Sequence, residues 1–264
     1  MTTPGPALVT IDADWPAPRH VLVRTTTRGG GVSEPPYESL NLAMHVGDDP
    51  ERVCANRARV REALRLPSGP AWLDQHHGAR VVDLERDDER RADGSYTRKA
   101  GIVCAILTAD CLPIVITDRS GAELTALHGG WRGLAAGIID AGLARMRSPR
   151  GDLIAWLGPA IGAEHYEVGE EVFDAFARQE PGLGSAFAPT RPGHYRCDLY
   201  AIARAMLHAR GVTSVHGGSH CAYREAARFY SYRRDGGNGR DTGRMATLAW
   251  MEPAGPRTAI LPRQ

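Results

Sequence analysis

Three strand-sized apolar runs follow one another near the middle of the chain, at residues 101–107, 112–117 and 123–127. Residues 118–121 (Asp-Arg-Ser-Gly) separate the last two runs and have the composition of a tight hairpin turn. Short apolar runs bounded by turn residues are typical of buried strands. The last two runs are therefore expected to pair as a hairpin, and the first run to form a further buried strand.

Strand and helix signals alternate along the rest of the chain. A β-branched strand is predicted at 21–26, and a helix is predicted to begin at Asp49 and Pro50 and to end near Leu64. Residues 71–82 are expected to hold a strand pair, and residues 85–99, which carry many charges of both signs, a solvated loop. Further strands are predicted at 153–157, 212–217, 230–234 and 244–250, and further helices at 134–146, 169–177 and 199–209. With no linker or repeat between them, these elements predict one α/β or mixed α+β domain over residues 1–264.

Charge and hydropathy exclude two broad classes of protein. The 264 residues include 32 Lys and Arg against 31 Asp and Glu, a net charge of +1, which does not favour a general nucleic-acid binder. No apolar run approaches the length of about 18 residues that a membrane span needs. Asp12 and Asp14 lie where a secretory signal would need an apolar centre. A soluble, cytoplasmic protein is expected, with a monomer favoured.

The five cysteines are an odd number and form no Cys-x-x-Cys pair. Neither a disulfide framework nor a zinc ribbon is therefore encoded locally. Cys54, Cys104 and Cys197 are expected to be packed thiols, which leaves Cys111 and Cys221 for closer consideration.

The predicted hairpin brings a cysteine and a histidine together. If Arg119 and Ser120 are the two loop residues, cross-strand partners have numbers that sum to 239, and Cys111 then lies opposite His128. Partners of this kind have Cβ atoms about 4.5–5.5 Å apart, close enough to share a tetrahedral metal. The alternative is a buried cysteine beside a histidine at a strand end.

A third metal ligand is available at residues 75–78 (Gln-His-His-Gly). Adjacent residues on a strand point in opposite directions, so only one of His76 and His77 is expected to reach the metal. Three protein ligands leave a fourth position open, which is typical of a catalytic rather than a structural zinc site.

At these residues the sequence resembles the YfiH/DUF152 family, whose members are also called laccase-domain or polyphenol-oxidase-like proteins. The resemblance spans roughly residues 28–244. It rests on residues 75–78, 108–113 (Thr-Ala-Asp-Cys-Leu-Pro), 128–133 (His-Gly-Gly-Trp-Arg-Gly) and 229–234 (Phe-Tyr-Ser-Tyr-Arg-Arg). The sequence departs from the family pattern at residues 93–96, where apolar residues commonly follow the glycine, and the departure concerns a loop on the substrate side.

The resemblance implies a zinc ion held by His77, Cys111 and His128, with a variable residue at the position of His76. It also implies a layered α/β/β/α fold with mixed sheets. The implied chemistry is phosphorolysis of the purine nucleosides adenosine, inosine, guanosine and methylthioadenosine, together with deamination of adenosine. Some relatives resemble enzymes that edit peptidoglycan precursors with the same metal.

Other functions can be weighed from the residues themselves. No His-x-His pair occurs, as a multicopper centre would require, so copper oxidase chemistry is disfavoured. The usual zinc deaminase signature is also missing. Three hypotheses stay open: a purine nucleoside enzyme, a cell-wall precursor hydrolase, and a metal-stabilised binding module without turnover. The open fourth coordination position argues against the third.

Phosphorolysis requires an anion pocket, and residues 129–133 lie where a helix is predicted to begin. Free N–H groups there favour phosphate, and Arg132 could add a bidentate contact. A tight turn with a solvent-exposed arginine is the alternative. Arg57 is similar in position to a family arginine near the metal, or is a surface charge on its helix.

Four further positions are candidates for the site. Asp110 could accept a proton or orient a metal ligand, or is an ordinary turn aspartate. Arg28 and Asn41 are taken as substrate-binding residues, although Asn41 could simply cap a turn. Cys221 is similar to a family cysteine near the pocket, but a core role is favoured. Arg233 and Arg234, if they lie on a strand, cannot both face a pocket.

Overall fold

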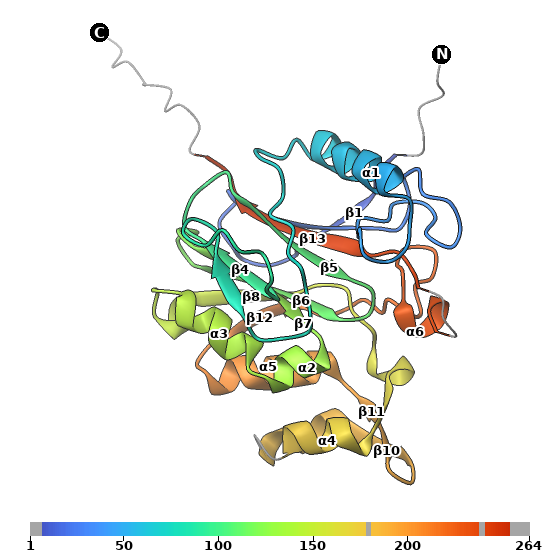
Figure 1. The fold of residues 1–264 in the computed structure, drawn as a ribbon. Coiled ribbons are helices and arrows are strands. Elements are labelled where there is room, and N and C mark those ends of the chain that lie inside the picture. Colours follow the sequence, from blue (N-terminus) through green and yellow to red (C-terminus); the bar gives the residue numbers. More distant parts are fainter. Residues whose placement is uncertain (1–6, 178–180, 238–240, 254–264) are drawn as a thin grey trace.

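Two β-sheets stack against each other with helices on their outer faces (Figure 1). The computed structural model describes residues 7–177, 181–237 and 241–253. The first sheet is antiparallel, in the order β1 (Thr10–Asp12), β2 (Val21–Thr26), β13 (Met245–Met251) and β5 (Val103–Thr108). The second is mixed, in the order β12 (Ser214–Gly217), β8 (Leu153–Leu157), β6 (Leu112–Asp118), β7 (Leu124–Gly129), β4 (Gly94–Thr97) and β3 (Val81–Asp83). The predicted α/β/β/α fold class with mixed sheets is confirmed.

Alternation of side chains along the strands explains why the central runs are apolar at every position. In β5, Cys104 and Ile106 pack between the two sheets, whereas Ala105 and Leu107 pack beneath the helix on the outer face. In β6, Val115 belongs to the layer between the sheets and its neighbours face the other helical layer. Each strand is therefore buried on both faces and has no polar side.

The outer layers are helices whose apolar faces cover the sheets. Helix α1 (Pro50–Ala63) covers the first sheet; as predicted, it begins at Asp49, whose carboxylate accepts the Glu51 N–H, and has proline at the start of the helix. The helices α2 (Trp131–Ala135), α3 (Ile138–Arg145) and α5 (Leu199–Ala209) cover the second sheet. Single turns of 3-10 helix occur at Arg150–Asp152 and Ala163–His165, and a longer one at Pro181–Ala186.

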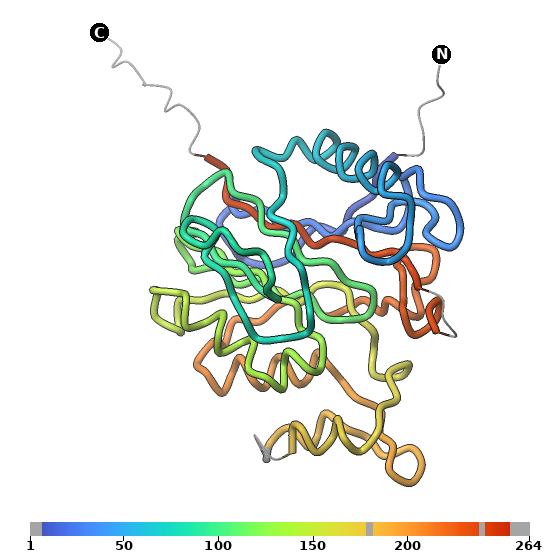
Figure 2. The backbone as a smooth tube through the Cα atoms, in the orientation of Figure 1, coloured from blue at the N-terminus to red at the C-terminus, as the bar shows by residue number. Residues whose placement is uncertain are grey.

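A small third sheet lies beyond the second helical layer, together with α4 (Glu170–Ala177) (Figure 2). Its strands have the order β10 (Phe187–Arg191), β11 (His194–Cys197) and β9 (Glu167–Gly169), all antiparallel. Phe173 stacks on Tyr195 with ring centroids 4.5 Å apart, which ties α4 to this sheet.

Two sequence predictions at residues 71–99 are wrong. Residues 71–82 do not form a strand pair: the structure shows isolated bridges at Ala71 and Asp74, and β3 begins only at Val81. Residues 85–99 are not simply a solvated loop, because residues 94–97 form β4, buried along its whole length between β7 and β3. The charges that surround this four-residue strand obscured it in the sequence.

Three other local predictions are also corrected. The helix predicted over 134–146 is two helices, α2 and α3, because Gly137 adopts the left-handed conformation (φ 89°) between them. The strand predicted over 230–234 is instead the short helix α6 (Tyr232–Asp235). Cys54 is exposed rather than packed, whereas Cys104 and Cys197 are buried, and all five cysteines are free thiols.

Candidate metal centre

The structure brings together the three side chains that the sequence predicted as metal ligands. One ligand atom from each of His77, Cys111 and His128 lies within 4.8 Å of the other two. The Cys111 Sγ is 3.8 Å from the His77 Nε2, and the two imidazole rings lie 4.7 Å apart. A tetrahedral zinc ion would separate sulfur and nitrogen ligands by about 3.6 Å. The group could therefore hold a metal ion with small adjustments.

The cross-strand pairing differs from the predicted one by two residues. His128 lies opposite Pro113, not Cys111, because the last paired residues are Thr117 and Leu124, so residues 118–123 form the turn instead of Arg119 and Ser120 alone. The Asp118 carboxylate accepts the N–H groups of Ser120, Ala122 and Glu123, which stabilises this longer turn. A shift of two residues preserves the face of a strand, so the cysteine and histidine still meet.

Asp93, which was not predicted as a site residue, contacts two of the segments that carry the candidate ligands. It is fully buried, and its Oδ1 lies 2.8 Å from the His128 Nδ1. A carboxylate at Nδ1 leaves the Nε2 of that ring for a metal, which is the usual arrangement around histidine ligands. The same carboxylate accepts the N–H groups of His76, His77 and Gly78 at 2.7–3.2 Å. Asp93 thus fixes two of the three ligand-bearing segments.

His76 and His77 lie in a bend rather than on a strand. His77 has a left-handed backbone (φ 63°) and joins the ligand group, whereas the His76 Nδ1 lies 3.3 Å from the Asp93 Oδ2. The prediction that one of the two faces the metal agrees with this geometry, although the cause is the bend and not strand alternation.

The charges of the ligand group favour metal binding near neutral pH. Burial alone would raise the pKa of the Cys111 thiol, but His128 and His77 beside it lower that pKa to about 6. Burial opposes the charged form of His128, yet the Cys111 thiolate and Asp93 raise its pKa to about 9. At pH 7 the cysteine is therefore a thiolate, the form that binds metals, and an incoming cation displaces the proton of the imidazole.

Gly130 leaves room for the ligand side chains. A Cβ atom at this position would lie 3.0 Å from both the Cys111 Sγ and the His77 Cδ2. Such contacts are tighter than ordinary van der Waals packing. The glycine pair after His128 therefore allows the chain to pass directly beside the ligands.

A cavity of about 530 Å³ opens over the ligand group. Asp110 and Arg132, two of the predicted catalytic residues, line it. Asp110 is nearly buried; its Oδ2 accepts the Arg233 N–H at 2.7 Å, and its Oδ1 has no hydrogen-bond partner among the described residues. Burial raises the pKa of this carboxyl, against the opposing effect of the Arg233 N–H and nearby arginines. The Arg132 guanidinium lies over the Trp131 ring, 4.4 Å from its centroid.

The other predicted site residues, Arg57, Asn41 and Arg28, are not among the described residues that line this cavity. The Arg57 guanidinium donates to the Leu42 carbonyl and stacks 4.1 Å from the Trp72 ring centroid, and burial lowers its pKa. Asn41 is fully buried, and its amide bonds the backbone of Ala43. These contacts give both residues structural roles; their predicted roles in catalysis and substrate binding stay predictions.

Arg28 also lies outside the cavity lining. Its guanidinium donates to the Glu38 and Ala226 carbonyls and lies 3.7 Å from the Asp235 carboxylate. Its role in substrate binding stays a prediction as well.

The sequence analysis also missed three polar residues of the cavity wall, His45, Asp241 and Arg244. Arg244 forms an ion pair with Asp241 at 3.0 Å. Burial lowers the pKa of His45, and the nearby Arg244 adds to this effect. No motif marks these positions, because they come from separate segments that only the fold brings together.

Comparison with known proteins identifies the family. Residues 22–252 match the family described as multi-copper polyphenol oxidoreductase laccase. The purine nucleoside phosphorylase PA4543 of Pseudomonas aeruginosa is 49% identical over 240 residues, which cover 90% of this chain and 97% of that protein. The purine nucleoside phosphorylase YfiH of Escherichia coli is 44% identical, over 90% and 96% of the two chains.

A solved structure extends the similarity to the fold. The crystal structure of Neisseria meningitidis protein NMB0706, of the DUF152 family, has a TM-score of 0.86 and 45% identity, and the match covers 92% of this chain and 99% of that one. The chain belongs to the YfiH/DUF152 family.

Among the described residues, the cavity lacks the methionine that blue-copper sites commonly use. Such a site has a weak axial ligand, usually methionine, beside one cysteine and two histidines.

No helix in the described part of the chain combines the length and the apolar character needed to cross a bilayer.

Replacing Asp93 with asparagine is expected to weaken metal affinity by roughly tenfold to a hundredfold. An asparagine amide can present a donor to the His128 Nδ1 and no longer stabilises the tautomer that leaves Nε2 for the metal. Competition against a chelator of known affinity measures the change. Asp88→Asn, at an exposed position five residues earlier, is the matched control and should bind metal like the wild type. Equal affinities for Asp93→Asn and wild type would contradict the role assigned to Asp93.

Proposed function

We propose that this protein is a zinc-dependent purine nucleoside phosphorylase that acts on adenosine, inosine, guanosine and methylthioadenosine. The observation that carries the proposal is a metal-ligand group with an open face in the same cavity as Arg132 and Asp110, in a chain 49% identical to a relative named purine nucleoside phosphorylase. A cavity of about 530 Å³ falls within the size range of small-molecule sites.

Zinc is the metal that suits this ligand group best. One thiolate and two imidazoles are typical zinc ligands, and catalytic zinc sites keep a fourth position for water or substrate. When bound, the ion would supply a Lewis acid that polarises a group of the substrate. Phosphate binding and proton transfer are carried out by the residues of the chain.

In phosphorolysis, a phosphate oxygen forms a bond to the ribose C1′ while the bond from C1′ to the purine nitrogen breaks. The Arg132 guanidinium, at the cavity wall, holds the phosphate by charge-assisted hydrogen bonds. Helix α2 has only five residues, so its dipole adds little and the side chain carries the anion contact.

Asp110 is suited to protonate the leaving purine. Burial raises the pKa of Asp110, and this residue lines the cavity, so its carboxyl is the candidate to carry the proton. Delivery of that proton to the departing nitrogen releases a neutral base. Deamination of adenosine would use the same metal and purine site without phosphate.

Identifying the products formed from adenosine and phosphate tests the proposal. Mass spectrometry should show adenine and ribose 1-phosphate, with inosine and hypoxanthine if deamination also occurs. Ribose 1-phosphate should require added phosphate. The absence of these products, together with cleavage of a muramyl peptide, would instead identify a hydrolase of cell-wall precursors.

A further inference from the structure

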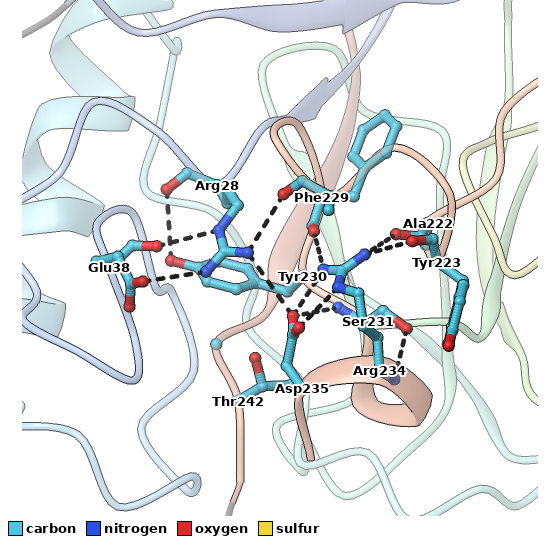
Figure 3. Close-up of polar contacts among 12 residues, drawn as sticks. Arg28, Glu38, Ala222, Tyr223, Phe229, Tyr230, Ser231, Arg234, Asp235 and Thr242 are labelled. Carbon is cyan, nitrogen blue, oxygen red and sulfur yellow. Dashed lines mark hydrogen bonds and ion pairs between the residues drawn. The ribbon is translucent and has the colours of Figure 1, made fainter.

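Two neighbouring arginines of α6, Arg233 and Arg234, have opposite environments. Arg234 uses all five of its N–H donors within the chain (Figure 3). Its guanidinium donates to the carbonyls of Ala222, Tyr223 and Phe229 at 2.6–2.8 Å, and twice to the Asp235 carboxylate at 2.7 Å. Arg234 therefore has no donor left for a ligand and holds α6 against residues 222–229.

Arg233 makes a single side-chain hydrogen bond among the described residues, from Nη1 to the Glu167 carbonyl at 2.8 Å. Four of its five N–H donors are left for a ligand. The guanidinium lies 5.2 Å from the centroid of the Tyr166 ring, and both residues line the cavity above the metal-ligand group. Its position is fixed at the backbone too, because its N–H donates to Asp110, the neighbour of Cys111.

Three arginines of the described residues line the cavity, and their surroundings differ. Arg244 is neutralised by Asp241 and also donates to the carbonyls of Thr242 and Gly243. Arg132 and Arg233 form no ion pair among the described residues, and both line the cavity. Two guanidinium groups that face one cavity suit a ligand with several anionic oxygens.

We propose that Arg233 is a second phosphate-binding residue, which holds the anion together with Arg132. This inference rests on the proposed function for the identity of the anion, but its geometry does not depend on turnover. Arg234 and Asp235 keep α6 in place. The Arg233 side chain lines the cavity.

Calorimetric titration of the zinc-loaded protein with inorganic phosphate, at constant ionic strength, measures phosphate affinity and tests the proposal. Arg233→Gln should weaken phosphate binding by about tenfold or more, as expected for the loss of a charged hydrogen-bond donor. The variant keeps the backbone N–H that binds Asp110, so zinc content and melting temperature should match the wild type. Arg228→Gln is the matched control: it removes a cation from the same segment, but one paired with Glu225 outside the cavity, and should bind phosphate normally.

Steady-state kinetics then separate this inference from the proposed function. If phosphorolysis occurs, Arg233→Gln should raise the KM for phosphate about tenfold while the KM for nucleoside changes by less than about twofold. Phosphorolysis with an unchanged KM for phosphate would overturn the role of Arg233 alone. If the wild type shows no phosphorolysis, the proposed function fails, but weaker phosphate binding by Arg233→Gln still supports the anion site. If Arg233→Gln and the wild type bind phosphate with equal affinity, or if neither binds it, the anion site proposed at Arg233 is overturned.

Discussion

Replacing Cys111 with alanine is expected to reduce bound zinc from about one ion per chain to almost none. The substitution removes the one thiolate of the site, and two neutral imidazoles cannot supply its charge. Elemental analysis of protein purified with zinc present measures the change. Nucleoside cleavage should be lost along with the metal.

Two controls make this result specific to the ligand group. Cys54→Ala changes an exposed thiol on α1 and should leave zinc content unaltered. His76→Ala should retain zinc and His77→Ala should lose it, because His77 belongs to the ligand group and His76 faces Asp93. The reverse result for the two histidines would show that the third ligand is assigned to the wrong residue.

Replacing Arg132 with alanine is expected to reduce kcat/KM for phosphorolysis by roughly tenfold to a hundredfold. This is the effect of losing a charge-assisted hydrogen bond worth about 1.5–3 kcal/mol. Deamination of adenosine should decline less, because it requires the metal site and a bound purine but no phosphate. Both rates can be measured on one preparation by separating the purine products.

Arg119→Ala, in the exposed connection between β6 and β7, is the matched control and should leave both rates unchanged. Equal losses of both activities in Arg132→Ala, with zinc content and folding intact, would mean that this arginine positions the nucleoside. The phosphate pocket would then lie elsewhere. Arg57 is also expected from the sequence to act on the phosphate; its guanidinium contacts the Leu42 carbonyl and the Trp72 ring, and its catalytic role stays a prediction.

Two of the three candidate metal ligands could be brought together from the sequence by a local rule. A register shift of one residue would have reversed the face of the strand, but the actual shift is two residues, so Cys111 and His128 still meet. The resemblance to the family then selected His77 from the two adjacent histidines. Helix α1 was equally predictable, since Asp49 and Pro50 mark its start.

Asp93 escaped prediction because its role depends on contacts distant in sequence. It ends a segment rich in exposed charges, and only the pairing of β4 with β7 carries it into the interior beside His128. Residues 230–234 have the composition of a strand, yet Arg234 binds five acceptors that only the folded loop supplies. Sequence patterns do not show such non-local hydrogen bonds.

The most direct test of the account follows one preparation through metal removal and return. Formation of ribose 1-phosphate from inosine and phosphate is measured by mass spectrometry for zinc-loaded protein, for protein stripped by a chelator, and for the stripped protein after zinc is restored. A catalytic zinc ion at this site predicts product from the first and third samples and almost none from the second. Equal product from the metal-free sample, or none from fully zinc-loaded protein, would contradict it.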